Sequence, residues 1–173
     1  VLNFDQALKL IDTYKDKARE DGWEPGPDRF MVGVPTAVAE TFEEAKEALH
    51  SGTQYFFDVL QGGINRAQQL VVQQTRFNED DVLVRPVNKD QTMKATPVEE
   101  RIENGQVLCG TPDMVVDQIK RMHTALNHGH MNLIVKIGNM PDEFVLRSMK
   151  LLGQHVFPEV KHLGKSDASV AAE

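Results

Sequence analysis

The last third of the chain alternates between helix and strand patterns, and this alternation restricts the folds available to it. Residues Cys109 to Asp113 open a helix, Asn132 to Gly138 read as a strand, and Asp142 to His162 read as another helix. Thr111 is a suitable N-cap, and Pro112 suits the first turn, where its missing N–H is not needed. Helix, strand and helix in this order are typical of an α/β barrel.

The first part of the chain adds a helix and a strand. Asn3 with Gln6 three residues later predicts a capped helix that ends near Gly22. Phe30 to Val38 is almost continuously apolar, as in a parallel strand covered on both faces. Pro35 interrupts this run, because proline removes a ladder donor and favours edges or bulges. A bend in the strand is expected there.

A second capped helix follows, and after it a long polar stretch. Thr41 and Glu44 form a capping-box pattern that predicts a helix from Phe42, with a break and restart at Gly62-Gly63. Residues 76–105 are polar and irregular, apart from one short β-like run at 82–84. A long insertion of this kind in a barrel is more often a functional loop or a flexible cover than core.

Four motifs together resemble the bacterial luciferase-like, flavin-dependent monooxygenase family. They are Ala39 to Ala45, Gly110-Thr111-Pro112-Asp113, the apolar strand Leu133 to Ile137, and Val156-Phe157-Pro158. The resemblance covers residues 1–163 and is strongest from 107 to 160. It implies the C-terminal part of a (β/α)₈ TIM barrel, rich in helices and with few strands.

The length of the chain agrees with only part of such a barrel. A complete (β/α)₈ barrel needs about 250 residues, whereas this chain has 173 and begins at Val1. We therefore expect residues 1–163 to be the C-terminal portion of a barrel within a longer protein. Residues 164–173 have small and polar side chains without periodicity, which predicts a flexible tail.

The resemblance also implies an activity for the full-length protein. Family members use reduced FMN, supplied by a separate flavin reductase, and oxygen to attack a small organic substrate; a related class uses the deazaflavin F420. In such chemistry the cofactor performs the difficult step and the protein orients it. The fragment alone is expected to be inactive and to form a homo-oligomer or to pair with its missing N-terminal half. The alternative is a non-catalytic, partner-binding or degenerate half-barrel subunit.

The resemblance leaves the catalytic residues unassigned, because the family's main flavin contacts lie on strands that precede this segment. Within the chain, the ends of the two predicted strands should lie nearest the barrel mouth. The candidates for cofactor contact there are Thr36, Lys136, Gly138 and Asn139. Lys136 is the best polar candidate, and a salt-bridged structural lysine is the other interpretation.

Charge and composition exclude several partners. A formal net charge of −7 and a pI of about 5.4 argue against binding to nucleic acid or anionic lipid. No apolar run approaches the length of a membrane span. The single cysteine excludes an internal disulfide framework and fits a cytoplasmic protein.

Other candidate sites have simpler interpretations. His123, His128 and His130 could hold a metal, but solvated turn histidines are the favoured reading, and no metal site is predicted. Cys109 stands before a helix N-terminus, which would lower the pKa of its thiol, although a buried structural cysteine is far more common. The acidic pairs and the basic residues of the polar stretch read as surface charge: Glu43-Glu44, Asp80-Asp81, Glu99-Glu100, Arg76, Arg85 and Lys94.

Overall fold

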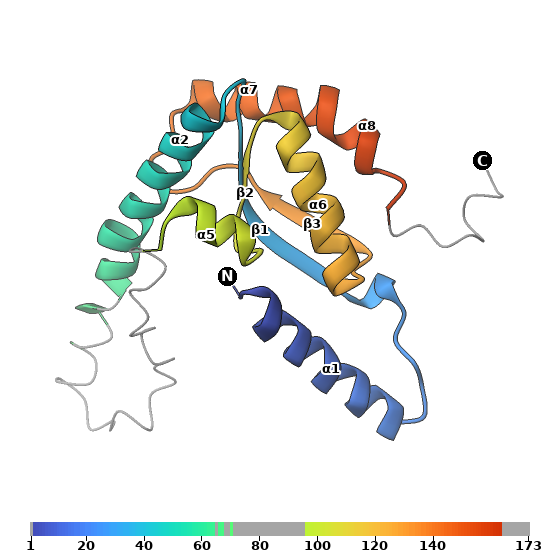
Figure 1. Cartoon of the computed structure of the whole chain (residues 1–173). Helices are drawn as coiled ribbons and strands as arrows, with labels where there is room; N and C mark the ends of the chain where they lie inside the picture. The colour runs from blue at the N-terminus through green and yellow to red at the C-terminus, as the bar shows by residue number, and fades with distance from the viewer. Residues whose placement is uncertain (1, 65, 68–69, 71–95, 164–173) are drawn as a thin grey trace.

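The computed structural model describes residues 2–64, 66–67, 70 and 96–163. Its centre is a parallel sheet of three strands in the order β2-β1-β3 (Figure 1). The strands are β1 (Met31–Val38), β2 (Leu108–Gly110) and β3 (His130–Ile134). The chain is therefore a helix-rich α/β protein, as predicted.

The strand order is not the sequence order. In a closed (β/α)₈ barrel each strand lies beside the next strand of the chain. Here β3 pairs with β1 rather than with β2, so that β1 is the central strand. Among the described residues the three strands thus differ in order from three consecutive barrel strands, while the alternation of helices and parallel strands is that of part of an α/β barrel.

Pro35 lies where β1 changes partners. The last β1–β3 pair is Pro35↔Ile134, and the first β1–β2 pair is Thr36↔Leu108. A residue without an N–H is tolerated where one ladder ends and the other begins, because no regular pairing requires its donor there. A bend was predicted at Pro35; the structure shows instead that β1 changes its pairing partner there, from β3 to β2.

Helices cover both faces of the sheet. The helix α1 (Phe4–Glu20) precedes β1, and α2 (Phe42–Tyr55) follows it. The next described elements are α5 (Val98–Glu103) before β2 and α6 (Pro112–Leu126) after it. The last described elements are α7, a π-helical turn and α8, which in Figure 1 run across one end of the sheet. Their bounds are Asp142–Leu151, Leu152–Val156 and Phe157–Val160.

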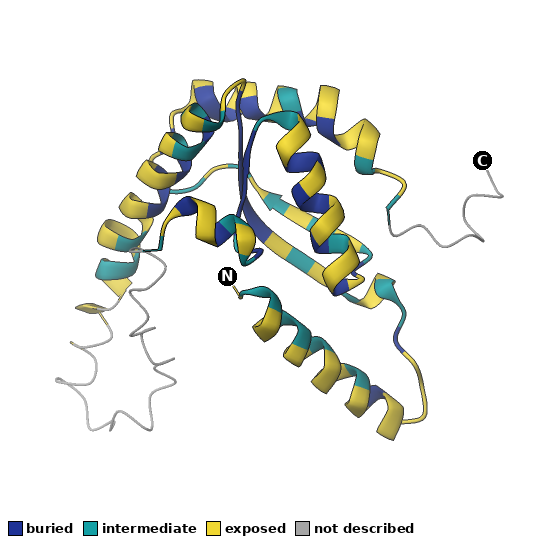
Figure 2. Ribbon diagram, viewed as in Figure 1, coloured by how far each residue is buried: buried dark blue, intermediate teal, exposed yellow. Residues whose placement is uncertain are grey.

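Two hydrophobic clusters hold these layers together (Figure 2). On one face, Val34 and Val38 of β1 pack with Leu108 against the apolar stripe of α6 and the π-helical turn before α8. On the other face, Ala37 and Cys109 pack against α2, α5 and α7. Alternate residues of the same strands therefore serve opposite cores, as expected for a sheet covered on both sides.

Most of the predicted helix signals are confirmed. Asn3 and Gln6 form a complete capping box, and Thr111 caps α6 with Pro112 in its first turn. The second capping box is only half formed. The Thr41 hydroxyl accepts from the Glu44 N–H at 3.3 Å, but the Glu44 carboxylate pairs with Arg147 instead of reaching back to the cap.

Several boundaries differ from the predictions. Gly62 and Gly63 are helical, so the predicted break there is wrong; a π-helical turn, Phe56–Gln61, precedes them instead. The strand predicted at Asn132 to Gly138 begins and ends earlier, because the N–H of His130 already bonds the Phe30 carbonyl at the start of β1. Part of the stretch expected to be irregular, Val98–Glu103, forms α5. The β-like run at 82–84 and the tail at 164–173 lie outside the described residues.

Candidate functional site

The C-terminal ends of the strands are where a parallel α/β sheet places its ligands. The ends of β1 and β2 lie side by side, since the Ala39 N–H donates to the Gly110 carbonyl at 3.1 Å. The next residue, Thr111, caps α6 at this edge. This edge, together with the loop after β3, is the candidate site.

Thr36 lies inside the protein rather than at the mouth. Its side chain is fully buried, and its hydroxyl donates to the Val34 carbonyl at 3.1 Å. In this position the hydroxyl stabilises its own strand and does not face open volume.

The basic groups at this edge are engaged by carboxylates. Lys136 forms an exposed ion pair with Asp142 at the start of α7. Arg147 pairs with Glu44 at 2.6 Å and approaches Glu40 at 4.0 Å, which ties α7 to the β1–α2 connection. Both interactions are on the surface, where an ion pair contributes at most about 1 kcal/mol.

The loop after β3 packs closely on α2. Gly138 has a φ of 55°, and a Cβ there would overlap the carbonyl oxygen of Gly52. Asn139 is exposed and faces neither of the two cavities described below. Gly138 is therefore needed for close backbone packing, which is an alternative to a cofactor contact.

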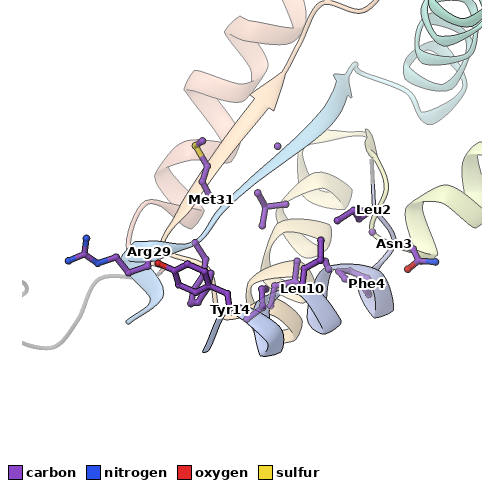
Figure 3. Close-up of a pocket in the computed structure, with 14 residues that line it drawn as sticks. Leu2, Asn3, Phe4, Leu10, Tyr14, Arg29 and Met31 are labelled. Carbon is purple, nitrogen blue, oxygen red and sulfur yellow. The ribbon is translucent and has the colours of Figure 1, made fainter. Parts of the chain in front are cut away.

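Two cavities in the described part of the structure lie away from this edge. The larger, about 470 Å³, is a mostly apolar groove between α1 and the start of β1, with Leu10, Tyr14 and Met31 along it (Figure 3). The smaller, about 220 Å³, lies between the start of β3 and α8. Neither is lined by Thr111, Lys136 or Gly138.

The three histidines do not form a metal site. His123 and His128 have ring centroids 5.5 Å apart, and a ring nitrogen of His123 contacts the His128 carbonyl at 3.1 Å. His130 is exposed. Burial, and next the neighbouring His123, lower the pKa of His128 to about 4. Over the described parts of the chain, no group of three or more His, Cys, Asp or Glu residues is arranged to hold a metal.

Cys109 is a core residue and not an activated thiol. It is fully buried on β2, and burial raises its pKa to about 12. The favoured interpretation, a buried structural cysteine, is confirmed, and desolvation raises the pKa of the thiol instead of lowering it. The nearby Arg101 is also buried, and burial lowers the pKa of its guanidinium.

Two polar residues that were not predicted from the sequence bind backbone groups at the edges of the sheet. Gln118 of α6 binds the backbone of Cys109 with both ends of its carboxamide. Ser148 of α7 accepts the Val38 N–H at 2.9 Å. The sequence contains one indication of this role for Gln118. It is a polar residue three positions after Val115, on the apolar face of the helix.

Of the remaining candidates, Arg76, Arg85, Lys94 and the pair Asp80-Asp81 lie outside the described residues. Glu99 pairs with Lys46 at 2.5 Å, which joins α5 to α2. No described helix has the length and hydrophobicity that would let it cross a membrane.

Comparison with known proteins places the chain in a family. The sequence profile of the luciferase-like monooxygenases matches residues 2–128. No curated protein matches the sequence. Two solved structures are similar in fold: monooxygenase RslO1 from Streptomyces bottropensis, with 22% identity and a TM-score of 0.58, and the oxygenating constituent of 3,6-diketocamphane monooxygenase from Pseudomonas putida, with 20% identity and a TM-score of 0.59. The latter is a type II Baeyer-Villiger monooxygenase in complex with FMN.

The alignments cover nearly the whole of this chain but less than half of each relative. They include 90% and 92% of this chain, and 38% and 41% of the Streptomyces and Pseudomonas proteins. At these identities the structures show a shared fold and no more. The profile match, which extends over more than half of the sequence, shows that the chain belongs to the luciferase-like monooxygenase family.

Proposed function

We propose that this chain contributes the C-terminal part of a flavin-dependent monooxygenase whose cofactor is FMN. The family match over residues 2–128 carries this proposal. The FMN complex of the Pseudomonas putida relative supports the choice of FMN over F420. Reduced FMN comes from a separate flavin reductase, and the substrate is a small organic molecule.

The described residues at the strand ends do not by themselves fit FMN. A flavin needs a cavity for its ring and polar groups for its phosphate. At the strand ends, Lys136 is bound to Asp142 and Thr36 is buried against Val34. Neither of the two cavities described above is lined by these side chains. We therefore propose that flavin contacts come largely from strands beyond this segment, and we assign no catalytic step to residues of this chain.

The second candidate function is a non-catalytic subunit that binds a partner. The specific observation in its favour is that Gln118 and Ser148 already satisfy backbone groups at the edges of the sheet, at Cys109 and Val38. Such a subunit folds without the rest of a barrel. Under the first proposal the chain instead self-associates or pairs with an N-terminal half.

Catalysis separates the two candidates. Oxygen uptake would be followed with FMN, NADH and a flavin reductase, once with the 173-residue chain and once with the complete product of its gene. The monooxygenase proposal predicts that the complete product changes the rate at which oxygen reoxidises reduced FMN, whereas the 173-residue chain leaves it at the rate of free flavin. A folded complete product without effect would support the non-catalytic subunit.

A further inference from the structure

The outer edge of β2 is occupied by a side chain. The N–H of Cys109 donates to Oε1 of Gln118 at 2.9 Å, and Nε2 of Gln118 donates to the Cys109 carbonyl at 2.8 Å. A carboxamide that donates and accepts in this way reproduces the pair of hydrogen bonds that a neighbouring strand would make. Gln118 is only 8% exposed, so water does not compete for either bond.

These two bonds lie on the side of β2 that faces away from β1. The adjacent residue Gly110 directs its carbonyl to the Ala39 N–H on the β1 side. Because successive residues of a strand direct their backbone groups to opposite edges, the groups of Cys109 belong to the other edge. That edge is the position of β3 in a barrel, where consecutive strands are neighbours.

β3 is found instead on the free edge of β1. It pairs there from Met31↔His130 to Pro35↔Ile134. Beyond its end, Ser148 continues the edge by accepting the Val38 N–H. Both strand orders are compatible with right-handed crossovers: α6 lies opposite α2 in the observed order, and on the same face as α2 in the barrel order.

We propose that Gln118 competes with β3 for the outer edge of β2 and thereby sets the strand order of this chain. Gln118 is nine residues from Cys109 in the sequence, whereas β3 must close a longer loop. Local contacts have the smaller entropic cost of closure. The hydrogen bonds between Gln118 and Cys109 therefore form first, and β3 then pairs with β1. The proposed function rests on the barrel order. In that order, β3 lies beside β2, and backbone hydrogen bonds between the two strands replace the bonds from the Gln118 side chain.

A disulfide reports the strand order directly. Gly33 and Asn132 are paired across β1 and β3, and both are exposed. Paired positions on neighbouring strands are within the distance range of a disulfide. The variant G33C/N132C should therefore cross-link after refolding under mild oxidation. The buried Cys109 does not compete for this reaction. Failure of the folded double variant to cross-link would overturn the proposal.

The deciding variant is Gln118→Met in this background, since methionine keeps the length of the side chain without its hydrogen bonds. The matched control is Lys120→Met, on the exposed face of the same helix. Two hydrogen bonds, each with a net contribution of about 0.5–1.5 kcal/mol, correspond to a shift of roughly tenfold. We expect the ratio of cross-linked to free chain to fall by about that factor with Q118M and to stay unchanged with K120M.

Other outcomes are also decisive. Unchanged cross-linking in folded Q118M, with or without self-association, would show that Gln118 does not control the strand order. If Q118M does not fold, Gln118→Glu replaces it, because a carboxylate still accepts from the Cys109 N–H. Q118E should give an intermediate ratio, and a ratio equal to that of the unsubstituted background would overturn the proposal. No flavin enters this experiment, so its failure is distinguishable from failure of the monooxygenase proposal.

Discussion

Gly138 lies with its backbone directly against the backbone of Gly52, and neither position has room for a side chain. A Cβ on Gly52 would come within 2.5 Å of the Ile137 carbonyl oxygen, and one on Gly138 would overlap the Gly52 carbonyl. This contact joins the loop after β3 to α2. Just beyond it, α2 passes into the π-helical turn Phe56–Gln61.

Replacing Gly138 with alanine should destabilise the protein strongly. The residue has a φ of 55°, which costs a non-glycine residue about 1 kcal/mol, and the overlap adds a similar or larger amount. We expect the free energy of unfolding in urea to fall by about 2–4 kcal/mol. The control is Gly63→Ala, which is exposed, helical and free of contacts, and should be neutral or slightly stabilising. Equal effects of the two variants would contradict the described packing.

Ser148 should matter for stability because its hydroxyl binds a buried backbone N–H of β1. Ser148→Ala removes the acceptor of the Val38 N–H and leaves that buried donor unsatisfied, at a cost of about 1–3 kcal/mol. Ser51→Ala, on the exposed surface of α2, is the matched control and should have little effect. Thermal unfolding measured by circular dichroism compares the two. A loss no larger than that of S51A would show that the Ser148–Val38 bond does not form.

The buried thiol of Cys109 predicts a pH dependence. Burial raises its pKa from an ordinary value of 9.0 to about 12 in the folded chain. The thiol therefore ionises first in the unfolded chain. Its contribution to stability is complete below about pH 9 and is lost as the pH rises towards 12, at about 1.4 kcal/mol per pH unit. Urea unfolding at several pH values would show this slope, and Cys109→Ala should remove it. Rapid reaction of the folded protein with a thiol reagent at pH 8 would argue against this burial.

Lys136 can be tested as a cofactor contact through its ion-pair partner. If the lysine binds the flavin phosphate in the complete protein, Lys136→Met should weaken FMN binding by about tenfold or more. Asp142→Asn frees the lysine and should leave the FMN affinity unchanged or improve it. If Lys136 serves only the ion pair, both variants lower stability by less than about 1 kcal/mol and neither changes FMN binding. Fluorescence titration with FMN distinguishes the two roles.

The sequence was most informative where local chemistry decides the structure. The Asn3–Gln6 capping box and the Thr111 cap follow from neighbouring residues, and both were predicted. The family was predicted from short motifs in the same way, and the profile match confirms it.

Features that depend on distant contacts were not predicted. β2 is only three residues long, too short for a periodic pattern, and is defined by its pairing with Thr36 to Val38. The strand order depends on which edge β3 occupies, and that choice involves Gln118 and Ser148, which lie on helices. The residues predicted to contact a cofactor at the barrel mouth do not come together in one site, for a related reason. Thr36 is directed into the core by strand alternation, and Gly138 is held against α2.

FMN binding by the complete gene product, compared with the 173-residue chain under the same conditions, tests the central claim most directly. Quenching of flavin fluorescence would be titrated for both, with circular dichroism to show that each is folded. The account predicts saturable binding by the complete product and none by the 173-residue chain. A folded complete product that does not bind FMN would contradict the proposed monooxygenase function, and tight binding by the 173-residue chain would contradict the conclusion that its described residues do not form the site.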